Sequence, residues 1–164
     1  VEIAGVQRIG HGIDIGFEKD SEALLKRMAA NGIAVEINLS SNEQILGVAG
    51  KDHPFPTYLK AGVPVMLSTD DEGVERIDLA SQYQLAAERY DLGYRVLKTR
   101  SRQSLEKSFL TGESLWQDFR VFTLAGECSH GFDAATGKAF TGTSDKARAQ
   151  VELEKRFMAF EARW

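Results

Sequence analysis

Three short apolar segments in the first half of the chain are separated by segments whose apolar residues recur at helical spacing. The apolar segments cover residues 6–12, 33–39 and 63–67, and their length and β-branched content predict buried strands. Helices are predicted over residues 18–31, ending at Gly32, and from the Pro-rich turn at 53–56 to Gly62. Strands alternating with helices in this way predict parallel strands joined by right-handed crossovers.

The second half of the chain reads as helical. Apolar spacing predicts helices over residues 77–89, 94–110 and 113–126, whereas 126–142, with four glycines and several Ser and Thr residues, reads as a loop. Residues 40–42, which follow the second strand, form a polar cluster that suits a loop and a helix cap. A last helix begins at about Ser144 and carries an apolar stripe that favours either a core contact or a partner contact. The stripe consists of Leu153, Phe157, Phe160 and Trp164.

Asp70 and Asp71 follow the third apolar segment after Ser68 and Thr69. Two adjacent carboxylates at the mouth of a buried strand repel each other and are costly to desolvate, so a cation or a hydrogen-bond-donating substrate would stabilise them. The alternative is a solvated acidic turn in which one aspartate caps the next helix. His11, between Gly10 and Gly12, follows the first strand, and we expect all these groups at the carboxyl edge of the sheet, where parallel α/β proteins build their sites.

Composition excludes several classes of partner. The 164 residues are 43% hydrophobic and 27% charged, with a formal net charge of −4 and no basic stripe, which argues against nucleic acid or a membrane surface. No apolar run approaches the roughly 20 residues that a membrane-spanning helix needs. Cys128 is the single cysteine, so an intramolecular disulfide is impossible. The sequence leaves the compartment open, with the cytoplasm favoured.

Five motifs in this order resemble the adenosine deaminase family of metal-dependent hydrolases. They are Arg8-Ile9-Gly10-His11-Gly12, Ser41-Asn42, His53-Pro54, Ser68-Thr69-Asp70-Asp71 and the segment 104–110. The resemblance covers roughly the first two-thirds of the chain. It implies an α/β fold that is the C-terminal portion of a TIM-like (β/α)₈ barrel, strands six to eight with their helices, followed by additional C-terminal helices. The predicted division is residues 1–127 for the barrel part and 128–164 for a loop and helix packed on it.

The resemblance also implies a reaction and a role for each site residue. Asp70 would coordinate a catalytic Zn²⁺, Asp71 would contact the purine ring, and His11 would orient and deprotonate the metal-bound water. Ser41, Asn42 and His53 would be structural or would support the site residues from behind, outside the active site itself. The implied reaction is hydrolytic deamination of adenosine or a related aminopurine, giving inosine and ammonia from adenosine, in keeping with the general chemistry of zinc nucleobase deaminases.

The sequence departs from the family pattern in ways that limit these expectations. Asn38-Leu39 stands where many members have Cys-Pro, and Glu72-Gly73 stands where a proline is usual after the aspartates, which leaves the substrate preference open. The His-x-His and His-Ala-x-Glu motifs of the family are absent, and a complete barrel needs about 250 residues. We therefore expect a C-terminal part that is inactive alone and that either associates with itself or requires the missing part of the barrel.

Two alternatives remain open from the residues. A phosphoryl-transfer domain could hold Mg²⁺ on Asp70 and Asp71, although it would need a Gly-rich phosphate loop with a lysine, which the sequence does not show convincingly. A non-catalytic interaction module could use the apolar stripe to dock a partner while the aspartates cap a helix.

Overall fold

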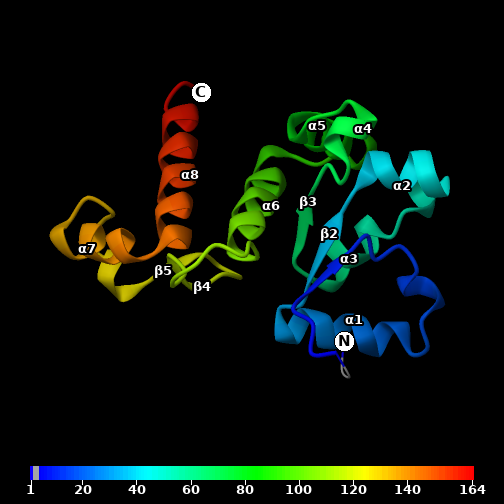
Figure 1. The fold of residues 1–164 in the computed structure, drawn as a ribbon, viewed down its shortest axis with the longest axis horizontal. Coiled ribbons are helices and arrows are strands. Elements are labelled where there is room, and N and C mark those ends of the chain that lie inside the picture. The colour runs from blue at the N-terminus through cyan, green and yellow to red at the C-terminus, as the bar shows by residue number, and fades with distance from the viewer. Residues whose placement is uncertain (2–3) are drawn as a thin grey trace. The chain divides into compact units, whose positions relative to one another are not determined.

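The computed structural model describes residue 1 and residues 4–164, which form two compact units, Val1–Ser101 and Arg102–Trp164 (Figure 1). The division predicted between residues 127 and 128 stays a prediction. No helix in the described part of the chain is long and apolar enough to cross a membrane.

The first unit is built on a parallel three-stranded sheet with strand order β1-β2-β3. The strands are β1 (Arg8–Gly10), β2 (Ala34–Ile37) and β3 (Val65–Leu67), which confirms the three predicted strand positions. Longer helices connect and follow them: α1 (Ser21–Asn31), α2 (Leu39–Leu46), α3 (Phe55–Ala61), α4 (Glu72–Glu75) and α5 (Leu79–Tyr90). Short 3₁₀ turns lie at Ile15–Phe17 and Gly50–Asp52. The α6 helix (Tyr94–Glu106) continues from this unit into the second and is shorter than predicted.

Two glycines end the crossover helices immediately before a strand. Gly32 and Gly62 adopt φ values of 63° and 74°, and their N–H groups bond to carbonyls in the last turns of α1 and α3. A residue with a Cβ atom is strained in this left-handed conformation, so glycine allows each helix to stop and the chain to turn into the sheet. Both predicted helix ends are confirmed.

The core of the first unit lies around β2 and β3. Val35, Ile37 and Val65 are fully buried, and Phe55 and Tyr58 from α3 pack in the same apolar cluster. Residues on both faces of β2 and β3 are buried, as expected for parallel strands covered by helices. Two of the three strands that carry the candidate site, β2 and β3, are therefore packed on both faces, whereas β1 is only partly buried.

The prediction of a loop over residues 40–42 is wrong, because these residues form the first turn of α2. Leu39 is 1% exposed and anchors the start of the helix in the core. Asn38 occupies the N-cap position but makes no side-chain cap bond, since its amide is directed to His11. Of the polar residues that suggested a loop, Ser41 and Asn42 are buried and Ser40 is partly buried.

The second unit contains an antiparallel hairpin where a helix was predicted over residues 113–126. The hairpin pairs β4 (Trp116–Asp118) with β5 (Thr123–Leu124), and a 3₁₀ turn follows at Gly126–Cys128. The connection is a turn in which Asp118 accepts the Arg120 N–H at 2.8 Å and Phe122 adopts a positive φ of 57°. Apolar residues with helical spacing therefore lie in a β-hairpin here, because a turn interrupts the segment.

Two helices complete the second unit, α7 (Ala135–Thr143) and α8 (Asp145–Glu161). The first corrects the predicted loop over residues 126–142, whereas the second begins where expected, with Ser144 Oγ accepting the Ala147 N–H at 3.0 Å. Glu154 of α8 pairs with Arg102 through bonds of 2.7 and 2.5 Å.

The apolar stripe on α8 is not a core seam along its whole length. Leu153 is half-buried, whereas Phe160 is 48% exposed and Trp164 is 93% exposed. The buried positions of this helix are instead Ala147, Gln150, Val151 and Glu154. The core-contact interpretation is therefore wrong for the C-terminal end of the stripe.

Gly12 offers a direct test of the packing beneath the site. It adopts φ +61°, and a Cβ atom there would lie 2.7 Å from Tyr58 Oη and 2.8 Å from Val35 Cγ1. We expect Gly12→Ala to lower the free energy of unfolding by about 2–4 kcal/mol, from backbone strain and overpacking together. The matched control is Gly10→Ala, because nothing lies within 4 Å of a Cβ at Gly10. Equal urea midpoints for the two variants would contradict this account.

Candidate functional site

The parallel pairing of the strands brings three chain segments to one edge of the sheet. His11 follows β1 and donates its backbone N–H to Glu36 O at 2.8 Å, and Ser68 follows β3 and donates to Ile37 O at 3.0 Å. Asn38 follows β2 between them. The strand ladders thus continue to the point where the polar side chains begin, which confirms the expectation that His11 and Asp70 share the carboxyl edge.

His11 and Asp70 both have left-handed backbones, with φ values of 62° and 56°. Neither occupies a helix-cap position, unlike the other non-glycine residues of the first unit with positive φ, which are Asp20, Arg76 and Asp91. This conformation costs on the order of 1 kcal/mol for a residue with a side chain, and it persists where the surrounding structure enforces it. Here it directs two titratable side chains toward each other.

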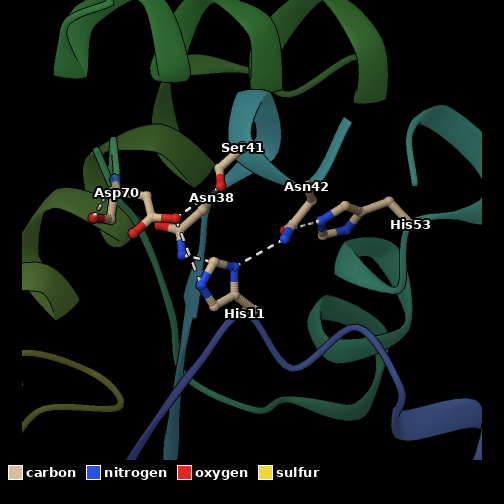
Figure 2. Close-up of polar contacts among 7 residues, drawn as sticks. His11, Asn38, Ser41, Asn42, His53 and Asp70 are labelled. Carbon is tan, nitrogen blue, oxygen red and sulfur yellow. Dashed lines mark hydrogen bonds and ion pairs between the residues drawn. The ribbon is translucent and has the colours of Figure 1, made fainter. Parts of the chain in front are cut away.

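The imidazole of His11 and the carboxylate of Asp70 are neighbours. His11 Nε2 lies 3.6 Å from Asp70 Oδ2, with the side chains 40% and 31% exposed (Figure 2). The same carboxylate oxygen accepts a 2.7 Å hydrogen bond from Ser41 Oγ at the start of α2. Ser41 therefore holds one oxygen of Asp70 in place while the pair remains open to solvent.

The other nitrogen of His11 faces two amides. Asn42 Nδ2 lies 2.9 Å from His11 Nδ1, and Asn38 Nδ2 lies 3.3 Å from the same atom. Asn42 Oδ1 in turn lies 3.0 Å from His53 Nε2 (Figure 2). His53 Nδ1 accepts the backbone N–H of Phe55 at 3.1 Å. A continuous chain of hydrogen bonds therefore runs from the start of α3 to the candidate site.

The sequence left open whether Ser41, Asn42 and His53 are structural or support the site residues, and it gave no contacts for them; all three are buried in contact with the site residues or with one another. A signal was available for the first two. Polar residues that directly follow a buried strand lie at the same edge as other strand-end groups. His53 comes from a different connection, and no local pattern places it beside Asn42.

Asp71 lies at the N-cap position of α4 without a side-chain cap bond. Its carbonyl oxygen accepts the N–H groups of Val74 and Glu75, each at 2.9 Å. Its side chain is exposed, so a substrate contact is sterically open to it. The alternative in which an aspartate side chain caps this helix is not what the structure shows for Asp71.

Burial lowers the pKa of His53 to about 4, with a smaller contribution from the positive charge of Arg89. His53 is 2% exposed, and its ring is therefore neutral at physiological pH. A neutral imidazole has one donor and one acceptor nitrogen, which matches its two hydrogen bonds.

The described residues contain no group of three or more His, Cys, Asp or Glu side chains arranged to hold a metal ion. Asp70 offers one carboxylate beside a histidine, whereas catalytic zinc sites have three protein ligands and an open position. The described donor set therefore fits at most one part of such a metal site.

A cavity of about 730 Å³ lies between β1 and α1 and is lined in part by His11, Gly12, Tyr58 and Met28. Its volume is within the range of small-molecule sites. Asp70 is not among its lining residues, so the cavity and the carboxylate share only His11.

The fold and the site together define an α/β protein that builds a polar centre at the carboxyl edge of parallel strands. The sequence model described as adenosine deaminase matches residues 1–115 of this chain. The chain belongs to the adenosine deaminase family.

Individual proteins agree with this assignment. The adenosine deaminase of Aliivibrio fischeri is 38% identical over 108 residues, which are 65% of this chain and 32% of that protein. An apo structure of the N6-methyl-AMP deaminase from Arabidopsis thaliana is 30% identical with a TM-score of 0.53, covering 63% of this chain and 29% of that one. An adenine deaminase structure from Arthrobacter aurescens has a TM-score of 0.58 at 23% identity, covering 67% and 33%, which shows a shared fold. The chain spans about a third of the length of these relatives.

The neutral His53 predicts a specific loss of stability in mild acid. Its pKa is about 6.5 unfolded and about 4 folded, so its contribution is fully present above pH 6.5 and is lost as pH falls toward 4. The loss reaches roughly 2–3 kcal/mol, because the unfolded chain binds a proton that the folded chain does not. Urea unfolding across this range should show a steeper decline for the native sequence than for His53→Gln, and parallel curves would contradict the prediction.

Proposed function

We propose that the whole protein catalyses zinc-dependent hydrolytic deamination of adenosine or a related aminopurine, with this chain supplying His11, Asp70 and Asp71. The observation that carries the proposal is the 3.6 Å approach of His11 to Asp70 at the carboxyl edge of the sheet, in a chain of the adenosine deaminase family. Family membership favours this function over a phosphoryl-transfer domain or a non-catalytic module.

Asp70 is the residue of this chain that would hold the metal. Ser41 Oγ occupies one side of Oδ2, which orients the carboxylate as a hydrogen-bonded metal ligand requires. When bound, zinc lowers the pKa of a coordinated water to about 7. His11 lies on the other side of the same oxygen and would orient the water that attacks the substrate.

Asp71 would contact the purine ring, and the class of substrate is an aminopurine. The named relatives are deaminases of adenosine, N6-methyl-AMP and adenine, which share an amino-substituted purine and differ in the sugar and phosphate. The exposed Asp71 and the Glu72-Gly73 sequence after it lie where such groups could be distinguished.

The three strands would be the sixth to eighth of a (β/α)₈ barrel. In the described residues the sheet ends at β1 on one side and at β3 on the other. Open edges of this kind pair readily with further strands, which is consistent with completion by the rest of the barrel or by self-association. The remaining metal ligands and the proton-donating glutamate would come from that part, so this chain alone would be inactive.

Substitution of Asp70 tests the assignment in the full-length protein encoded by the gene. Asp70→Asn removes a charged ligand, and we expect adenosine deamination to fall on the order of 10³-fold or more, with reduced zinc content. Glu22→Gln is the control, because this exposed carboxylate in the first turn of α1 has no assigned role. Equal activity and equal zinc in both variants would exclude Asp70 as a ligand.

The isolated 164-residue chain provides a second test. We expect zinc far below one ion per chain and no measurable release of ammonia from adenosine, AMP or adenine, because one carboxylate beside a histidine cannot retain the metal. Metal analysis and an ammonia assay are sufficient. Stoichiometric zinc with turnover by this chain alone would overturn the proposal that the site is shared.

A further inference from the structure

The backbone N–H of Phe55 determines which atom donates and which accepts in each hydrogen bond behind the site. This group can only donate, so His53 Nδ1, which lies 3.1 Å away, must present a lone pair. A neutral His53 ring therefore carries its proton on Nε2. The ring is buried, so there is no solvent to stabilise the doubly protonated form.

The donor and acceptor roles at His53 determine the orientation of the Asn42 amide. The His53 Nε2–H can only donate, so the Asn42 atom 3.0 Å away is the carbonyl oxygen and the opposite atom is the NH₂ group. The donor direction at His53 therefore fixes which end of the Asn42 amide faces each histidine. The Asn42 NH₂ group then donates to His11 Nδ1 at 2.9 Å.

A second amide supports the same state of His11. Asn38 Nδ2 lies 3.3 Å from His11 Nδ1, while the buried Asn38 Oδ1 has no hydrogen-bond partner within the described part of the chain. In the orientation that the structure has, Asn38 presents a second N–H donor to His11 Nδ1, in agreement with the Asn42 amide. The direction itself is set by Asn42, whose amide is fixed by His53.

We propose that His53 and Asn42 are positioning residues that fix neutral His11 as the tautomer with its proton on Nε2, the nitrogen beside Asp70 (Figure 2). His11 then presents an N–H donor to the candidate site. A neutral ring in this state cannot accept a proton through Nε2, so His11 orients an acceptor there and does not act as the base. This catalytic consequence rests on the proposed function, whereas the tautomer does not.

The tautomer can be measured in the 164-residue chain, which contains three histidines. Long-range ¹H–¹⁵N correlation spectra distinguish protonated from unprotonated ring nitrogens, and His130→Gln, at an exposed position, assists assignment and should leave the others unchanged. Well above the unperturbed histidine pKa of about 6.5, we expect the Nε2–H form of His11 to exceed the Nδ1–H form on the order of 30 to one, from two amide donors. A dominant Nδ1–H signal in the native sequence would overturn the proposal without any variant.

Variants of the relay separate positioning from general packing. Asn42→Asp replaces the donor with an acceptor and should reverse the His11 tautomer to Nδ1–H. His53→Phe leaves the Asn42 amide free to rotate and should lower the tautomer ratio on the order of tenfold. His53→Gln, which can accept from Phe55 and donate to Asn42, should restore the native ratio. Retention of the native ratio in a folded Asn42→Asp variant would contradict the relay.

The full-length protein gives the catalytic readout. His53→Phe should reduce kcat on the order of 10- to 100-fold with little change in KM, with recovery in His53→Gln. A native tautomer in a full-length protein that deaminates no aminopurine would refute the proposed function and leave the relay intact. An active full-length protein in which His11 carries its proton on Nδ1 would refute the relay and leave the proposed function intact.

Discussion

The pairing of three parallel strands is the constraint on which the candidate site depends. Because β1, β2 and β3 run in the same direction, their carboxyl ends place His11, Asn38 and Asp70 at one edge of the sheet. Buried apolar residues on both faces of β2 and β3 hold this register, since a shift would expose the core. The left-handed backbones of His11 and Asp70 are sustained by that framework, which turns two loop residues into a preorganised pair.

A second constraint operates within the site. The Phe55 N–H, the His53 ring and the Asn42 amide form a buried relay in which every group has a single compatible orientation. Such a network stabilises the folded protein only when each of its polar groups has a hydrogen-bond partner, because an unpaired buried polar group costs on the order of 1–3 kcal/mol. The start of α3 is thereby coupled to the imidazole beside Asp70, although the two segments are distant in sequence.

Sequence reasoning recovered the parts of the fold that local chemistry determines. The strands followed from apolar runs, and Gly32 and Gly62 marked the helix ends because they adopt positive φ. The shared edge of His11 and Asp70 followed from strand direction alone. The residues around them did not, because the contact of His53 with Asn42 depends on how α2 and α3 fold, and burial of Leu39 converts a polar loop into a helix.

The second unit was harder to predict because its apolar spacing is compatible with more than one structure. Trp116 and Phe122 suit a helix by spacing but pack as an edge-to-face pair in a hairpin. Phe160 and Trp164 continue a helical stripe beyond the point where the core ends. Periodicity shows that a face is apolar, whereas what covers that face is decided by tertiary structure.

The central claim is that Asp70 contributes to a metal centre completed by residues outside this chain. The most direct measurement is a crystal structure of the full-length protein with anomalous scattering data collected at the zinc absorption edge. The account predicts a zinc peak bonded to the Asp70 carboxylate, with His11 Nε2 beside the metal-bound water and Ser41 on the same carboxylate. A fully occupied zinc site elsewhere, with Asp70 and His11 contacting only each other and solvent, would contradict it.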